Sequence, residues 1–197
     1  FEPALSHWVQ AGDFERAAQL IERRGTEMLA LGEMVTLRRW IEMLSSEVTR
    51  ERPWLCVLYA WTLLLGWDVD KSLTWIETAQ QCQPTQGENG VIAGHIAALR
   101  AYIAGIQNDD RQSQAFCRQA LEWLPQDEIF LRGLIAYLFG VLNLRSGDLD
   151  AAWSAIEEAG RISRASGVQH VSVLAQTALG VIQSIQGRFQ QAWQTYR

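Results

Sequence analysis

The sequence has 197 residues, 48% of them hydrophobic and 20% charged, so it can bury a sizeable core and global disorder is excluded. Its 17 basic and 22 acidic residues give a net charge of −5, which disfavours direct binding of nucleic acid because phosphate contacts need a clustered basic surface. The longest nearly apolar stretch, residues 57–67, is shorter than the roughly 20 residues that span a bilayer, so we expect a cytoplasmic protein without membrane contact.

The first predicted element is a helical hairpin over residues 3–25, and an extra helical segment follows over residues 26–50. In that segment, apolar side chains recur at helical spacing at Leu37, Trp40, Ile41 and Leu44. Four more hairpins are predicted, with Pro53 at the start of one helix and Pro125 at the end of another. They lie near residues 53–82, 91–124, 128–166 and 168–197.

The hairpins share a repeated frame, which is clearest in the last two copies. A small residue is followed by a Gly seven positions later, by Ala twelve later and by a large apolar residue sixteen later. Weaker copies begin at Ala60 and Ala101, and a further one begins near Leu5. The later copies start at residues 60, 101, 140 and 180, so the repeat steps are 41, 39 and 40 residues. The residues in the seventh position are Gly12, Trp67, Asn108, Gly147 and Gly187.

This frame predicts pairs of closely packed helices. A Gly or Asn in the seventh position tolerates left-handed φ and ends the first helix, and Asp13 and Asp148 can then cap the second. The small residues allow the two helix axes to approach closely. We find no convincing alternation typical of strands, so the sequence predicts an all-α fold built as one continuous stack of hairpins. The small residues are Ala60, Ala101, Gly140 and Gly180, facing Ser72, Ser113, Ala152 and Ala192.

Three segments, 120–125, 147–152 and 187–192, resemble tetratricopeptide repeats (TPRs), with a step longer than the usual 34 residues. The lengthened repeat is similar to that of the MalT-type, LuxR-family ATP-dependent transcriptional activators. Segments 4–22, 36–44 and 52–61 strengthen this resemblance. It implies a right-handed superhelix of helical hairpins, with residues 1–197 forming a single repeat domain of a longer chain. It also implies a sensor domain that binds an effector and other proteins.

No motif for catalysis or phosphate binding accompanies the repeats. The sequence has no Gly-x-x-x-x-Gly-Lys loop, no His-Glu-x-x-His and no Gly-x-Ser-x-Gly, so we predict no catalytic residue, no metal and no cofactor. The expected partners are a small-molecule inducer or a protein or peptide, other domains of its own chain, and a second copy through self-association. A free-standing TPR-like scaffold or adaptor that binds peptides is the alternative.

Candidate ligand contacts lie on the first helix of each hairpin. On each first helix, the small residue marks the contact with the second helix. A stripe next to this contact contains the positions six and three before the small residue and one and five after it, and we term it the concave stripe. In TPR-like stacks this stripe faces the concave side. It is rich in aromatic rings with a few polar groups, which suit an inducer or an amphipathic helix, unless a neighbouring repeat or domain covers it. The predicted contacts are Trp61, His95, Tyr102, Tyr137 and Arg145.

The three cysteines, Cys56, Cys82 and Cys117, are far apart and each lies in a predicted helix. Their odd number and wide spacing argue against a disulfide framework or a zinc site. We therefore expect three buried free thiols in a reducing compartment. Among the nine tryptophans, Trp75, Trp153 and Trp193 are predicted to pack between successive hairpins.

Overall fold

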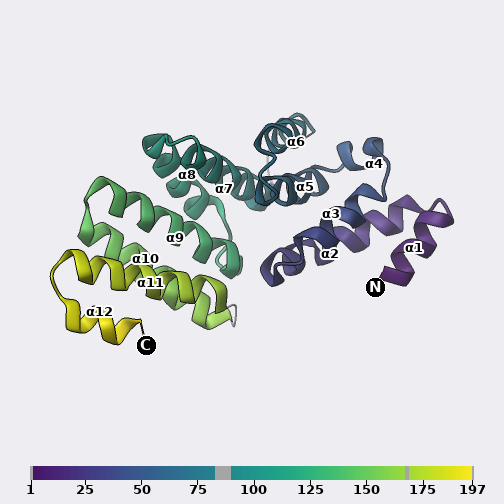
Figure 1. Cartoon of the computed structure of the whole chain (residues 1–197). Coiled ribbons are helices and arrows are strands. Elements are labelled where there is room, and N and C mark those ends of the chain that lie inside the picture. Colours follow the sequence, from purple (N-terminus) through teal and green to yellow (C-terminus); the bar gives the residue numbers. More distant parts are fainter. Residues whose placement is uncertain (1, 83–89, 167–168, 197) are drawn as a thin grey trace. The chain divides into compact units, whose positions relative to one another are not determined.

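The computed structural model describes residues 2–82, 90–166 and 169–196, and every regular element within them is a helix (Figure 1). The predicted all-α, TPR-like fold is therefore confirmed. The helices are α1 (Glu2–Gln10), α2 (Phe14–Leu31), α3 (Met34–Glu42), α4 (Ser46–Arg50), α5 (Pro53–Leu65), α6 (Val69–Gln81), α7 (Gly90–Ile106), α8 (Asp110–Trp123), α9 (Ile129–Ser146), α10 (Leu149–Ser166), α11 (Gln169–Ile185) and α12 (Phe189–Thr195).

The chain divides into two compact units, Phe1–Ile92 and Ala93–Arg197. In the first unit, α1 pairs with α2, α5 pairs with α6, and α2 and α3 both pack against α5. The expected extra helix is two elements, because α3 ends at Glu42 and Ser45 caps the short α4, its side chain accepting from the amide of Val48. Helix α2 also continues past the predicted hairpin to Leu31.

Ion pairs and an indole hydrogen bond tie α2 to the start of α5 in the first unit. The Arg52 guanidinium lies 2.9 Å from a carboxylate oxygen of Glu22 and also contacts Glu15. The Trp54 indole nitrogen donates to the backbone carbonyl of Glu22 at 3.2 Å. These contacts hold the N-terminal hairpin against α5, whose inward side chains are fully buried at Leu55, Leu58 and Leu63.

In the second unit α9 packs against α8, α10 and α11, and α11 packs against α12 (Figure 1). Helix α9 is the one described helix that is long and apolar enough to cross a membrane by length and composition. Its neighbours cover it on several sides, as is usual for a core helix. The residues buried between α10 and α11 are Ala152, Ile156, Ala175, Ala178 and Ile182.

The seventh residue of the frame has a left-handed backbone in every copy. The φ angle is 74° at Gly12, 64° at Trp67, 60° at Asn108, 85° at Gly147 and 74° at Gly187. Trp67 and Asn108 are the described non-glycine residues with positive φ. The predicted helix breaks are therefore confirmed, and they are set by position in the frame more than by residue type.

An aspartate follows the break in four of the five hairpins and caps the second helix. The carboxylates of Asp13, Asp68, Asp109 and Asp148 accept from backbone amides three residues later, at 3.0 to 3.3 Å. The caps predicted at Asp13 and Asp148 are thus confirmed, and two more join them. In the last hairpin this position is Arg188, whose side chain makes no capping hydrogen bond.

Candidate functional site

The concave stripe is more exposed on α11 than on α5 and α7, where the exposed members are Leu65 and Ile106 near the helix ends. Its members on α5 and α7 include Trp61 and His95, which are 2% and 1% exposed. On α9, Tyr137 is partly buried and Arg145 is exposed. On α11 all four members are exposed: Leu174, Thr177, Val181 and Ile185. A ligand in solution can therefore reach the stripe on α9 and α11 more readily than the side chains of Trp61 and His95.

Two of the predicted contacts, Tyr102 and Tyr137, are neighbours in the second unit. Burial raises the pKa of the Tyr102 hydroxyl, and Cys117 and Tyr137 add to this shift by their proximity. Burial also raises the pKa of Tyr137. Tyr137 packs against Ala136 and Ala159 as well as against the residues buried between α10 and α11. Both phenols are therefore neutral at physiological pH and can contribute to packing as well as to binding.

Arg145 lies at the C-terminal end of α9, next to the turn between α7 and α8. Its guanidinium is 3.2 Å from a carboxylate oxygen of Asp110 and 3.3 Å from the side-chain oxygen of Asn108. Asn108 is the left-handed break residue of that hairpin. The frame thus places an exposed cation where two hairpins meet, and its ion pair keeps it oriented.

His95 lies near the opposite end of α7, away from Arg145. Its Nε2 atom is 3.9 Å from a carboxylate oxygen of Glu128, the residue that precedes α9. Trp61 belongs to the first unit, and the other four predicted contacts belong to the second. The structure brings together Tyr102 and Tyr137, and Arg145 lies about two helical turns after Tyr137 on α9. The ligand contacts themselves stay a prediction.

An apolar surface that the sequence did not indicate covers α11 and α12. It consists of large side chains that are 50 to 70% exposed, and we call it the terminal apolar face. Trp193 was predicted to pack between hairpins, and this is wrong because its side chain is 61% exposed. The frame alone could not predict exposure, since exposure depends on which element packs against the last hairpin. The face comprises Val173, Ile185, Phe189, Trp193 and Tyr196, of which Ile185 also belongs to the concave stripe.

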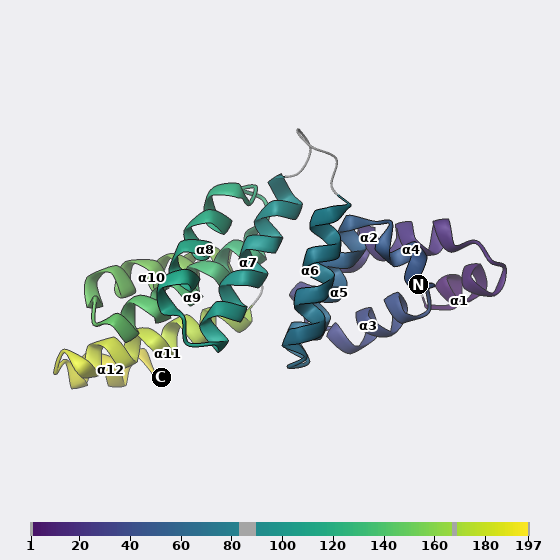
Figure 2. The ribbon, with the colours of Figure 1, turned by 90° about the horizontal axis from the view of Figure 1, so that it is seen from above.

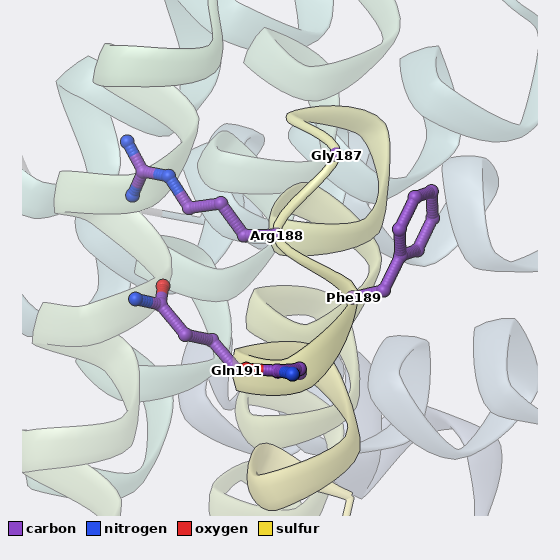
Figure 3. A pocket seen from close by; sticks show the side chains of 5 residues that line it. Gly187, Arg188, Phe189 and Gln191 are labelled. Atoms are coloured by element: carbon purple, nitrogen blue, oxygen red, sulfur yellow. The ribbon is translucent and has the colours of Figure 1, made fainter.

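A shallow hollow lies beside the turn into α12 (Figure 3). Arg188 and Gln191 point to one side of the helix and Phe189 points to the other. Five consecutive residues, 187–191, line it, so no second element encloses a ligand there. Among the described residues, no group of three or more His, Cys, Asp and Glu side chains could hold a metal ion.

The cysteines differ from one another in exposure. Cys56 and Cys117 are buried, and Cys82 is exposed at the end of α6. The prediction that all three are buried is wrong for Cys82, because the helix ends there and its side chain lies at the rim of the hairpin.

Comparison with known proteins places the repeats in a family. The model of the MalT-like TPR region matches residues 94–197. The HTH-type transcriptional regulator MalT of Cronobacter sakazakii is 24% identical over 193 residues, which cover 98% of this chain and 21% of that protein. The chain therefore spans about a fifth of the length of this relative.

Proposed function

Because this chain belongs to the family of MalT-like TPR regions, we propose that it is the effector-binding and protein-interaction domain of an ATP-dependent transcription regulator. The observation that carries the proposal is the alignment of 98% of the chain with a transcriptional regulator. In this proposal the chain has no catalysis of its own and does not contact nucleic acid directly. It works in the cytoplasm, and other domains of a longer protein supply ATP hydrolysis and DNA binding.

The second unit has the features that the proposed effector site needs. The stripe on α9 and α11 combines exposed apolar side chains, such as Val181, with the cation of Arg145. Apolar surface supplies affinity and a few polar groups supply orientation in small-molecule sites. Arg145 already holds a carboxylate in Asp110, so an anionic group on an effector would compete for the same guanidinium.

The terminal apolar face suits a protein contact better than a small molecule. Its side chains lie on α11 and α12, which pack against each other, and are at least 50% exposed, and exposed apolar patches often mark interaction sites. In this proposal the face binds another domain of the same longer protein or a second copy of it. Effector binding on the neighbouring stripe of α11 would then alter that contact.

The effector site can be tested by titration and by transcription. A panel of neutral sugars, nucleotides and amphipathic peptides is titrated calorimetrically into this chain. For any compound that binds, we expect Arg145→Gln to weaken binding about tenfold or more if an ionic group is recognised. Tyr137→Ala should also weaken it. The same variants in the longer protein should reduce inducer-dependent transcription from a reporter gene.

Arg161→Gln is the matched control. Arg161 is an exposed arginine of α10 that pairs with Glu158 at 2.5 Å, but it lies outside the stripe. It should leave both binding and transcription unchanged. If a compound binds and the Trp61→Ala, Tyr137→Ala and Arg145→Gln variants all bind it as tightly as the parent, the stripe is not the effector site.

A further inference from the structure

Two cysteines converge on one backbone carbonyl in the first unit. Cys56 lies in the first turn of α5 and is fully buried, whereas Cys82 follows the last residue of α6 and is exposed. The Cys82 thiol donates to the carbonyl oxygen of Arg50 at 3.1 Å. The Cys56 thiol lies 3.8 Å from the same oxygen. The two sulfur atoms are therefore neighbours.

The hairpin geometry explains this proximity. Helices α5 and α6 are antiparallel and packed side by side, so the start of one and the end of the other lie at the same end of the hairpin (Figure 2). Arg50 ends α4 just before α5 begins, and its carbonyl points to this end. The Cys56 thiol donates to the adjacent carbonyl of Thr49 at 3.1 Å.

The two thiols differ in reactivity. Burial, and to a smaller extent the nearby Cys82 sulfur, together raise the pKa of the Cys56 thiol to about 12, because two neighbouring thiolates would repel each other. Cys56 therefore stays protonated and hidden from solvent. Cys82 is the sulfur that a dissolved oxidant can reach, and reactivity follows exposure and thiolate character.

We propose that Cys56 and Cys82 are a redox pair, which peroxide converts into a reversible disulfide joining the start of α5 to the end of α6. The exposed sulfur reacts with the oxidant first, and the buried sulfur then resolves the sulfenic intermediate. In a reducing compartment the pair rests as two thiols and forms the bond only transiently. The pair lies outside the stripe and the terminal apolar face, so this proposal does not depend on the proposed function.

The chemistry is a two-electron oxidation. The Cys82 thiolate attacks one oxygen of hydrogen peroxide, the O–O bond breaks, and the hydroxide that leaves takes up a proton and becomes water. The Cys56 sulfur then attacks the sulfenic sulfur of Cys82, and its proton leaves with the displaced hydroxide as a second water. Two thiols lose two electrons and one peroxide is reduced to two waters. A dithiol reductant restores both thiols by exchange.

The disulfide needs only local movement at the end of the hairpin. An S–S bond requires β-carbons roughly 3.8 Å apart, so the Cys82 thiol must leave the Arg50 carbonyl and turn toward α5. The bond closes the loop that contains most of both helices. We expect the oxidised chain to melt roughly 5 °C or more above the reduced chain, because the disulfide restricts the unfolded chain.

Peptide mapping tests the proposal directly. The reduced chain is treated with equimolar hydrogen peroxide, free thiols are alkylated, and the protein is digested with trypsin. Lys71 lies between the two cysteines, so Cys56 and Cys82 fall in separate peptides ending at Lys71 and Arg100. We expect one linked peptide pair, lighter by two hydrogen atoms than the two reduced peptides together, which a dithiol reductant separates.

Two variants make the test specific. Cys82→Ser changes an exposed position and should abolish both the linked peptides and the rise in melting temperature. Cys117→Ser removes the third thiol, which is buried in the second unit and whose pKa burial also raises to about 12, and should leave both unchanged. The proposal is wrong if the parent gives no linked pair, links two copies through Cys82, or accumulates Cys82 sulfinic acid as fast as a Cys56→Ala variant does.

Discussion

In the α5–α6 and α7–α8 hairpins, a buried serine hydroxyl fastens the second helix to the first. Ser72 donates to the carbonyl of Ala60 at 3.0 Å, and Ser113 donates to the carbonyl of Ala101 at 2.7 Å. In the α9–α10 and α11–α12 hairpins the same two positions hold glycine and alanine. The two helices thus approach closely in all four hairpins. In α5–α6 and α7–α8 a hydrogen bond stabilises the approach, whereas in α9–α10 and α11–α12 the small side chains alone permit it.

The glycine hairpins also differ from each other. A β-carbon on Gly140 would lie 2.4 Å from Cγ1 of Ile156, which is fully buried, and 3.1 Å from its backbone nitrogen. A β-carbon on Gly180 would meet the ring of Tyr196 at 2.6 Å, but that ring is 50% exposed and can move. We therefore expect a larger side chain to destabilise the α9–α10 hairpin, which is enclosed and lacks the serine hydrogen bond, more than the α11–α12 hairpin.

The largest expected effect comes from enlarging the alanine of the enclosed glycine hairpin. Ala152 is fully buried, so Ala152→Leu must push α9 and α10 apart. We expect a loss of about 3 kcal/mol in the free energy of unfolding, at the upper end of the usual cost of overpacking. Urea denaturation measures it. The control Ser154→Leu, at an exposed position of the same helix, should change stability by about 0.5 kcal/mol or less. An unchanged melting temperature in Ala152→Leu would contradict the packing assignment.

The second prediction contrasts the two glycine anchors. Replacing a helical glycine by alanine gains about 1 kcal/mol from helix propensity. At Gly140 the overlap with Ile156 should outweigh this gain and leave a net loss of roughly 1–2 kcal/mol. At Gly180 the Tyr196 ring can turn away, so the same change should be neutral or stabilising. Thermal denaturation of both variants checks the signs, and equal shifts would show that enclosure does not matter.

The serine hairpins should be more tolerant. Ser113→Ala removes one buried hydroxyl, which also hydrogen-bonds with the weakly polar Cys117 thiol, but it leaves the Ala101 carbonyl with its own helical partner. We expect a loss of about 1 kcal/mol. Ser72→Ala should behave alike, and Ser154→Ala on the surface of α10 is the control. A loss as large as that of Ala152→Leu would mean that the hydroxyl, and not the small size of the residue, controls the approach.

Much of the fold could be predicted because the frame repeats. One glycine at a given position is weak evidence, but the same position recurs at Trp67 and Asn108, and all five copies have a positive φ. The division of residues 26–50 into α3 and α4 could not be predicted this way, because the segment lies outside the frame. There the Ser45 cap, a purely local signal, decides where the second helix begins.

The candidate site was harder to predict than the fold. The stripe follows from helical periodicity, but the burial of Trp61 and His95 depends on elements that pack on them from other parts of the chain. The proximity of Cys56 and Cys82 likewise depends on antiparallel pairing, which brings the first residues of α5 next to the last residues of α6. Spacing rules for disulfides and metal sites consider close pairs and therefore miss it.

The smallest expected effect concerns the break residue of the α5–α6 hairpin. Trp67 has φ 64° and is 79% exposed, so its side chain gains little from packing while its backbone is strained. Trp67→Gly relieves that strain, although glycine also makes the unfolded chain more flexible, which costs about 0.4–1 kcal/mol. We expect a net gain of roughly 0.5 kcal/mol, or about 1–2 °C in melting temperature for a chain of this length.

The reverse change is available at Gly147, which has φ 85° and open space around an added β-carbon. Gly147→Ala should lower the free energy of unfolding by about 1 kcal/mol. Calorimetry on both variants measures the pair, and a lower melting temperature for Trp67→Gly would mean that the exposed indole stabilises this turn by more than its backbone strain costs.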